Sequence, residues 1–403
     1  VVYNEMKGAL ASPESVLSEE ISKSLFNTSP YGFESGGKPE AIPELTYEAF
    51  CDFHKKYYHP SNSFIYFYGK LDILHYLKKL DENYLNQYNE CDVKSNIYKE
   101  EKFSDFKNVK GTFSVSSPEQ KEGYAALSFV CGDCTNIMDT MGMEILNYIL
   151  MGNNASVLKN KLINLGIAED FSGWYDNTQL ETVFSIVAKK ADMDKIQLFK
   201  NTVFDVLNET AQKGFDERTL QACLNAWEFM IKEEDYGYKP KGLYYGMEAM
   251  KAWLHGKNPC DRIKSISTFN EIAEKSKNGF FEGLIKKYLI NNSHSSFVEI
   301  YPQFGKAQEV EKQLQNKLNE LKNSLSENQL LEIIDQTKAL KEYQEAEDSK
   351  EDLEKIPLLE INDIDKNEFT PETKLIESKK FNTIFTQADT NGILYFKYIL
   401  PLN

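Results

Sequence analysis

The chain has little cysteine, no long apolar run and no excess of positive charge. Its six cysteines are scattered over 403 residues, and only Cys131 and Cys134 form a Cys-x-x-Cys pair. That density argues against a disulfide framework and favours a reducing compartment, so we expect a cytoplasmic protein. There is no run of 18 apolar residues, and no basic and apolar leader opens the chain. We therefore expect neither a membrane span nor a secretory signal.

A nucleic-acid partner is also not expected, because the net charge is −16 and such partners require a basic face. Acidity fits a soluble protein, or a cavity that attracts basic peptides. Hydrophobic residues make up 41% of the chain and aromatic residues 13%, which is enough to bury a core. The length suggests two or three domains.

Both ends of the chain are abrupt. The first residues, VVYNEMKG, lack an initiator Met and start on two β-branched residues. At the other end, strands are predicted at 382–387 and 392–400 around a turn at Asp389–Gly392. A strand pair needs a larger sheet to join. We therefore predict that both ends are cuts through a longer polypeptide, whose other parts are partners of this chain.

The first hundred residues are predicted to be mainly helical. Residues 1–27 form helix with a break at Pro13, where Ser12 is the predicted N-cap. A further helix begins after Thr46, and FIYFYG at 64–69 is a predicted strand.

A second unit, starting near residue 110, mixes strands and helices. The predicted strands are 124–130, 182–191 and 295–302. The predicted helices are 138–151, one beginning at Ser156, 193–213, 216–235, 241–255 and 268–290. KKYYHPSNSFIYFYG of the first unit is echoed by KKYLINNSHSSFVEIYP of the second, which is either chance or the mark of a duplicated α/β domain.

Residues 306–347 carry two apolar stripes at helical spacing. One stripe runs from Val310 to Leu325 and the other from Leu330 to Tyr343, on either side of Ser326. They predict an αα-hairpin in which the two stripes form the seam.

Two stretches of the sequence are familiar. VVYNEMKG at 1–8 and YGFESGGKPEAIPELTYEAFCDFHKKYYHPSNSFIYFYG at 31–69 closely resemble the insulinase (pitrilysin-type) zinc metallopeptidases, with presequence protease and falcilysin as the nearest branch. The resemblance covers the whole chain. It implies an α+β fold of repeated metallopeptidase-type α/β domains, each an antiparallel-rich sheet covered by helices, plus a helical hairpin linker.

The resemblance also implies a metal ligand. In the family, a His-x-x-Glu-His helix supplies two zinc ligands and a general base, and a Glu in a stretch of the Asn-Glu-Met-Lys-Gly kind supplies the third ligand. Glu5 matches that third ligand, and Asn4 or Lys7 could orient it. Two His and one carboxylate leave an open position on zinc for water. Judged without the resemblance, Glu5 is one acid on a helix, and one acid is not a motif.

The sequence departs from the family in its histidines. The five are His54, His59, His75, His255 and His294, and they form neither His-x-x-Glu-His nor His-Glu-x-x-His. No catalytic residue is therefore expected within this chain. A lone carboxylate is a poor zinc site, so we expect the 403 residues by themselves to be metal-poor and inactive.

Other candidate sites are weaker. His54 and His59 flank a helix end and could hold adventitious metal, although His59-Pro60 is better explained as a turn. Cys131 and Cys134 have metal-like spacing without a second pair, so small apolar packing is the better explanation. Ser35-Gly36-Gly37-Lys38 lacks the spacing of a phosphate-binding loop.

The predicted domains follow the resemblance. They are the end of the first (catalytic) domain at 1–105, a second non-catalytic peptidase-like domain at 106–303, the hairpin linker at 304–360 and the start of a third domain at 361–403. The predicted function is part of a zinc endopeptidase that degrades short unstructured peptides in an enclosed chamber. This chain would supply the third ligand and chamber wall. The alternative is a non-catalytic structural or interaction subunit of the same fold.

Overall fold

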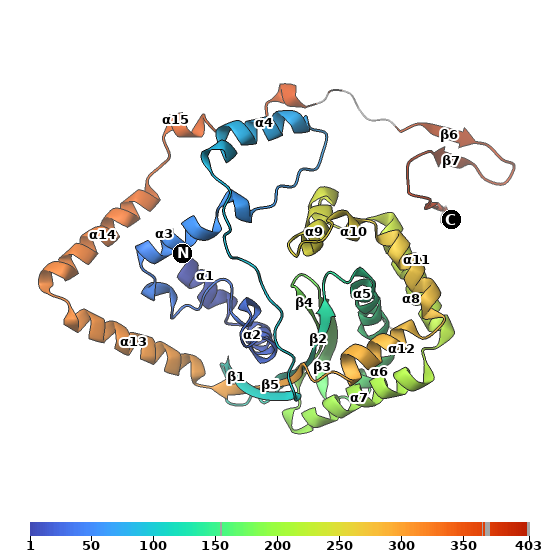
Figure 1. Ribbon diagram of the computed structural model, residues 1–403, viewed down its shortest axis with the longest axis horizontal. Helices are drawn as coiled ribbons and strands as arrows, with labels where there is room; N and C mark the ends of the chain where they lie inside the picture. The colour runs from blue at the N-terminus through green and yellow to red at the C-terminus, as the bar shows by residue number, and fades with distance from the viewer. Residues whose placement is uncertain (154, 365, 367–370, 401–403) are drawn as a thin grey trace. The chain divides into compact units, whose positions relative to one another are not determined.

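The computed structural model describes residues 1–153, 155–364, 366 and 371–400 (Figure 1). The chain divides into two compact units, Val1–Lys306 and Ala307–Asn403. The finer domain boundaries expected from the sequence stay predictions. Among the described helices, none combines the length and the apolar character needed to cross a membrane.

A five-stranded sheet forms the centre of the first unit, with the strand order β1-β5-β2-β4-β3. The strands are β1 (Lys107–Val115), β2 (Gly123–Asp133), β3 (Ala168–Asp176), β4 (Glu181–Ala191) and β5 (Ser295–Phe304). β1 and β5 run parallel, and the other neighbours run antiparallel. The three strands predicted in this unit are confirmed as β2, β4 and β5. The sequence analysis missed β1 and β3.

β2 is buried on both faces because helices cover both sides of the sheet. Leu127 and Phe129 point into the larger core, whereas Tyr124 and Ala126 point into a smaller one. Successive residues of a strand face opposite sides, so a strand covered twice has no polar face. This explains why YAALSFV carries no alternating pattern.

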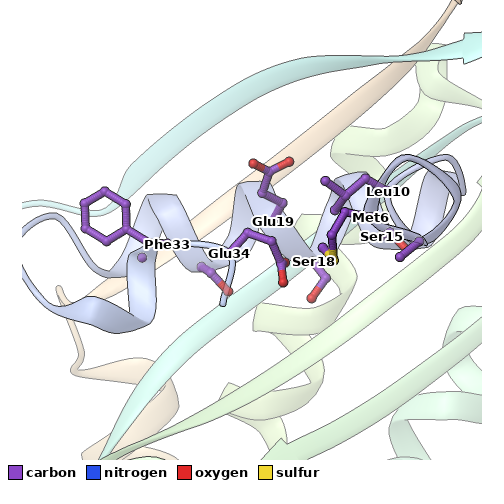
Figure 2. Close-up of a pocket in the computed structure, with 10 residues that line it drawn as sticks. Met6, Leu10, Ser15, Ser18, Glu19, Phe33 and Glu34 are labelled. Atoms are coloured by element: carbon purple, nitrogen blue, oxygen red, sulfur yellow. The ribbon is translucent and has the colours of Figure 1, made fainter. Parts of the chain in front are cut away.

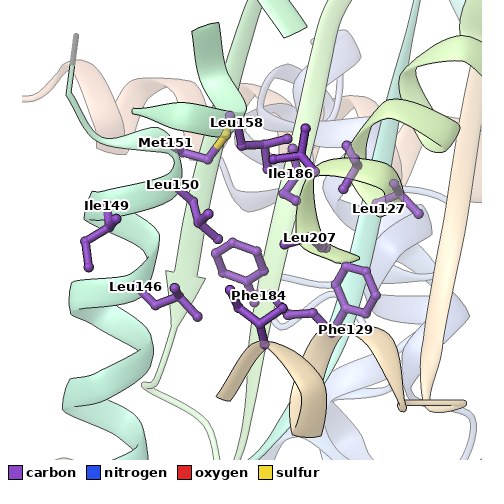
Figure 3. Packing of buried hydrophobic residues seen from close by; sticks show 14 of the residues in the cluster. Leu127, Phe129, Leu146, Ile149, Leu150, Met151, Leu158, Phe184, Ile186 and Leu207 are labelled. Atoms are coloured by element: carbon purple, nitrogen blue, oxygen red, sulfur yellow. The ribbon is translucent and has the colours of Figure 1, made fainter. Parts of the chain in front are cut away.

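Helices cover the face of the larger core (Figure 3). They are α5 (Ile137–Met151), α6 (Val157–Ile163), α7 (Ile196–Lys213), α8 (Glu217–Glu233), α11 (Ser265–Ser276) and α12 (Phe280–Leu284). Asp216 caps α8 as predicted, since its carboxylate accepts from the Thr219 N–H at 2.8 Å. The predicted helix 268–290 is instead broken into α11, α12 and a π-helical turn at 285–290. Gly279, with φ +78°, supplies the left-handed residue at the first break.

The opposite face of the sheet is covered by α2 (Pro13–Leu25), which buries Leu17, Ile21 and Leu25 against it. Ser12 caps α2 as predicted, because its hydroxyl accepts from the Ser15 N–H at 3.1 Å. The remaining helices of the unit are α1 (Val2–Ala9), α3 (Tyr47–Tyr57), α4 (Ile73–Asn83), α9 (Lys241–Trp253) and α10 (Cys260–Ile263).

The predicted strand at 64–69 is wrong. No other described strand pairs with this segment, and it has no regular structure. Its aromatic side chains pack on α9 instead. The rings of Phe64 and Trp253 lie 4.8 Å apart, and Tyr68 lies so close to Gly242 that a Cβ there would come within 2.2 Å of its ring.

The second unit contains α13 (Lys306–Ser324), α14 (Glu327–Glu345) and α15 (Lys350–Leu353), followed by strands β6 (Thr373–Ile376) and β7 (Thr383–Thr386). The two predicted long helices are confirmed, and Ser326 and Gln329 form a capping box at the start of α14. The predicted seam is not formed. Neither helix buries a residue, so both apolar stripes face solvent.

The predicted closing strand pair is also wrong. β7 falls within the predicted 382–387, but its antiparallel partner is β6, which precedes it. Residues 392–400 form no strand. The turn at Asp389–Gly392 is present, with the Ile393 N–H donating to the Thr390 carbonyl at 3.0 Å. The prediction paired 382–387 across the wrong turn.

Candidate functional site

Glu5 lies on α1, on the helix predicted for it, and its side chain is exposed. Its backbone N–H donates to the Val1 carbonyl at 3.1 Å, which closes the first helical turn. In the described part of the chain, no group of three His, Cys, Asp or Glu residues is arranged to hold a metal ion. These residues therefore do not make a zinc site by themselves, because zinc in proteins takes three or four ligands.

The helix that carries Glu5 is fixed by its next residue. Met6 packs against Gly36, where an added Cβ would lie 2.3 Å from the Met6 Sδ. A glycine is therefore needed for this close approach of loop and helix. The SGGK stretch thus has a packing role.

A pocket of about 220 Å³ opens between α1, α2 and the loop at 30–34 (Figure 2). Its lining residues are of three kinds, besides Gly32. Apolar side chains come from Met6, Ala9, Leu10 and Phe33, hydroxyls from Ser15, Ser18 and Ser22, and carboxylates from Glu19 and Glu34. Residues of α1 and α2 meet here because both helices begin within the first 13 residues of the chain. The pocket therefore adjoins the helix of Glu5.

The two carboxylates of the pocket differ in their partners. Glu19 pairs with Lys23 at 2.7 Å and with Lys38 at 3.4 Å. Burial opposes its ionisation, but the two lysines outweigh burial and hold the pKa of Glu19 below its usual value. Glu34 accepts only a hydrogen bond from the Gly36 N–H, at 3.2 Å. No lysine or arginine of the described chain pairs with Glu34.

The structure separates the two weaker histidine candidates. His54 stacks on Tyr58, with ring centroids 4.5 Å apart. His59 instead shapes the turn, as the sequence analysis favoured, because its Nδ1 accepts from the Ser61 N–H at 3.1 Å. The same nitrogen lies 3.3 Å from the sulfur of Cys91. Neither imidazole belongs to a three-ligand group among the described residues.

The Cys-x-x-Cys pair is structural. Cys131 is buried in the larger core, and Cys134 donates its thiol to the Lys251 carbonyl at 3.3 Å. Burial raises the pKa of both thiols, to about 11 for Cys134. Neither sulfur is a ready thiolate, which is the form that binds metal or reacts.

Arg262 is a buried charged residue that the sequence analysis missed. Its side chain is 5% exposed and lies 3.3 Å from Glu248 and 3.9 Å from Glu144, and it also donates to the Cys134 carbonyl at 3.1 Å. One guanidinium thereby ties α10 to α9, α5 and the end of β2. A signal was available, since only two of the 46 basic residues are arginines. Arginine is favoured where several fixed hydrogen bonds are needed.

Comparisons with known proteins cover nearly the whole chain. A model described as Peptidase M16 inactive domain matches residues 44–226, and one for the region associated with subfamily C of the same peptidases matches residues 300–403. Protein HypA of Clostridium perfringens is 38% identical over 405 residues, which cover all of this chain and 42% of that protein. Presequence protease 1 of Arabidopsis thaliana is 29% identical, over all of this chain and 38% of its own length.

Solved structures show the same fold at low identity. A protease from Helicobacter pylori matches with a TM-score of 0.58 and 16% identity, over 75% of this chain and 70% of its own. A Peptidase M16 inactive domain from Pseudomonas fluorescens matches with a TM-score of 0.54 and 16% identity, over 75% of this chain and 69% of its own.

The chain spans about two fifths of the length of the curated relatives it matches. The family models, the presequence protease relatives and the shared fold agree with the motifs at residues 1–8 and 31–69. The chain belongs to the insulinase-type M16 peptidase family.

Proposed function

We propose that this chain is part of a zinc-dependent endopeptidase that degrades short, unstructured peptides in an enclosed chamber. In this proposal Glu5 supplies one zinc ligand, and the covered sheet of the first unit supplies part of the chamber wall. The observation that carries the proposal is an exposed Glu5 on α1, within the family's Asn-Glu-Met-Lys-Gly stretch. Relatives named presequence protease, similar over the whole chain, support the peptidase activity.

The histidine ligands must then come from outside these 403 residues, since no histidine motif is present. The chain works together with further parts of the same polypeptide, and its substrates are peptides. The six free thiols support a reducing, cytoplasmic location.

Metal content tests the ligand role of Glu5. In the polypeptide that includes the His-x-x-Glu-His segment, Glu5→Gln should lower bound zinc at least tenfold after dialysis, because the carboxylate is a direct ligand. Glu14→Gln is the matched control, since Glu14 is an exposed acid on the next helix. Zinc would be counted by atomic emission. Unchanged zinc in the Glu5 variant would remove this residue from the ligand set.

The 403-residue chain itself should hold little zinc and leave a fluorogenic peptide uncut. Cleavage by this chain that a chelator abolishes would show that no outside segment is needed. Sequencing the DNA 5′ of the Val1 codon decides the source of the ligands. The proposal expects a His-x-x-Glu-His motif roughly 70–100 residues upstream.

The second candidate function is a non-catalytic structural or interaction subunit. The match of residues 44–226 to the inactive-domain model favours it. Absence of the histidine motif from the upstream sequence would support this candidate and sink the endopeptidase.

A further inference from the structure

The pocket beside α1 has the chemistry of a site for a long cationic side chain. Met6, Ala9 and Leu10 give it an apolar wall that suits the methylene stem of a lysine or arginine. Figure 2 shows the Glu34 side chain reaching between Phe33 and Ser18. None of the ten described residues that line the pocket is basic.

The charge in the pocket is uncompensated at one residue only. Glu19 already holds Lys23 and Lys38, so it has little left to offer a ligand. Glu34 is half-buried and accepts one backbone N–H, with no cation from the described chain nearby. A half-buried carboxylate without a counter-charge gains from a cationic partner, because water screens it less than on the open surface.

Phe33 is an independent indication of a cation. Its side chain is 73% exposed although it is large and apolar, and it stands next to Glu34 in the chain and in the pocket. An aromatic face beside a carboxylate attracts an ammonium or guanidinium group from two sides. An uncharged apolar ligand would use the ring but would strip water from Glu34 without replacing it.

We propose that this pocket binds a lysine or arginine side chain of the substrate peptide, with Glu34 as counter-charge and Phe33 as the stacking face. The inference rests on the proposed peptidase function, because Met6 follows Glu5 on the same helix. The basic residue would therefore lie close to the bond that is cut. Glu34 is a specificity-determining residue in this proposal and takes no part in the chemical step.

Cleavage kinetics test the specificity in the polypeptide that includes the histidine segment. Lysine is compared with norleucine, which keeps the stem and removes the charge, at each position flanking the cut bond. We expect kcat/KM to favour lysine about tenfold at one position, the size of a charge-assisted hydrogen bond in a partly exposed site. Glu34→Gln should abolish that ratio. Glu40→Gln, an exposed acid in the same loop outside the pocket, should preserve it.

The inference is overturned if no position favours lysine, or if Glu34→Gln leaves the ratio unchanged while norleucine peptides are still cut. In both cases the endopeptidase itself stands. If no peptide is cut at all, the proposed function fails and the pocket is judged by binding.

Binding is measured on the 403-residue chain, labelled with ¹³C at its methionine methyl groups. Nα-acetyl-lysine amide should shift the NMR signal of Met6, which lines the pocket, and Nα-acetyl-norleucine amide should not. The signal is assigned with Met6→Leu, and the exposed Met230 serves as an internal control. Equal responses to the two probes, or no response, would overturn the inference.

Discussion

His294 and Glu100 are the ionisable residues that tie the first helices to the sheet. The buried His294 ring lies with its Nε2 2.8 Å from the Leu25 carbonyl, so that nitrogen carries the proton. The Glu100 carboxylate accepts from the Thr28 and Ser29 N–H groups at 3.0 and 2.9 Å. Burial opposes ionisation of Glu100, but these hydrogen bonds outweigh burial and lower its pKa.

Stability should fall at mildly acidic pH because of His294. Burial lowers its pKa, and Lys107 and Lys102 act in the same direction, while the Leu25 carbonyl and Glu100 oppose it. The unfolded chain therefore binds the proton first, at a pKa of about 6.5, and the free energy of unfolding falls from there until the folded-state pKa is passed. Urea titrations between pH 8 and 5 would measure this slope, within the usual working range.

The matched variants are His294→Gln and His75→Gln. The first should flatten the slope and lower stability by about 1–3 kcal/mol, because the Leu25 carbonyl is buried and loses its well-placed donor. His75 is exposed on α4, so its replacement should change neither quantity. An unchanged slope in the His294 variant would show that another group controls it.

Residue roles were only partly predictable from the sequence. Ser12 and Asp216 act within four residues of their partners, so local spacing was sufficient to identify both caps. Arg262 acts through Cys134, Glu144 and Glu248, which lie on separate elements that only the fold brings together. The role of Glu5 stays a prediction from resemblance.

At the scale of elements, the 64–68 segment and α9 hold each other through two glycines. A Cβ at Gly242 would lie 2.2 Å from the ring of Tyr68, and one at Gly246 would lie 2.9 Å from that of Tyr66. The aromatic rings take the space that side chains on α9 would otherwise occupy.

Alanine at these helix glycines should therefore act in opposite directions at different sites. Alanine stabilises an open helix position by about 0.5–1 kcal/mol relative to glycine, and Gly283 on α12 is exposed with nothing near its Cβ direction. Gly242→Ala should instead cost about 1–3 kcal/mol through overpacking against Tyr68. Chemical denaturation would give both values. A stabilising Gly242→Ala would show that the segment does not pack on α9.

Element prediction failed where the sequence pattern required a neighbour to have an effect. FIYFYG has strand composition, yet a strand forms only with a partner, and no described strand is beside it. The stripes of α13 and α14 have helical spacing, which is local, and the helices formed. Their mutual packing is not local and did not form.

For the whole molecule, the buried apolar core lies entirely within the first unit. Every buried hydrophobic residue of the described chain lies between Leu17 and Ile300. The second unit, as far as it is described, buries none. Because burial supplies most of the free energy of folding, the two units should differ sharply in stability.

A chain of residues 1–306 should thus unfold cooperatively, with a Tm within about 2 °C of that of the 403-residue chain, because it loses no buried side chain. Calorimetry measures this, and brief trypsin treatment should trim the region after residue 306 first. A shift of about 10 °C or more would mean that the second unit adds core contacts to the first.

The strand order of the sheet also has a consequence for synthesis on the ribosome. β1 ends at Val115, but its only partner in the described sheet, β5, begins at Ser295. At bacterial and eukaryotic translation speeds, roughly 10–40 s separate the emergence of the two strands. Throughout that interval β1 and one edge of β2 are unpaired. The nascent chain is then most open to wrong pairing and is a natural client for a chaperone.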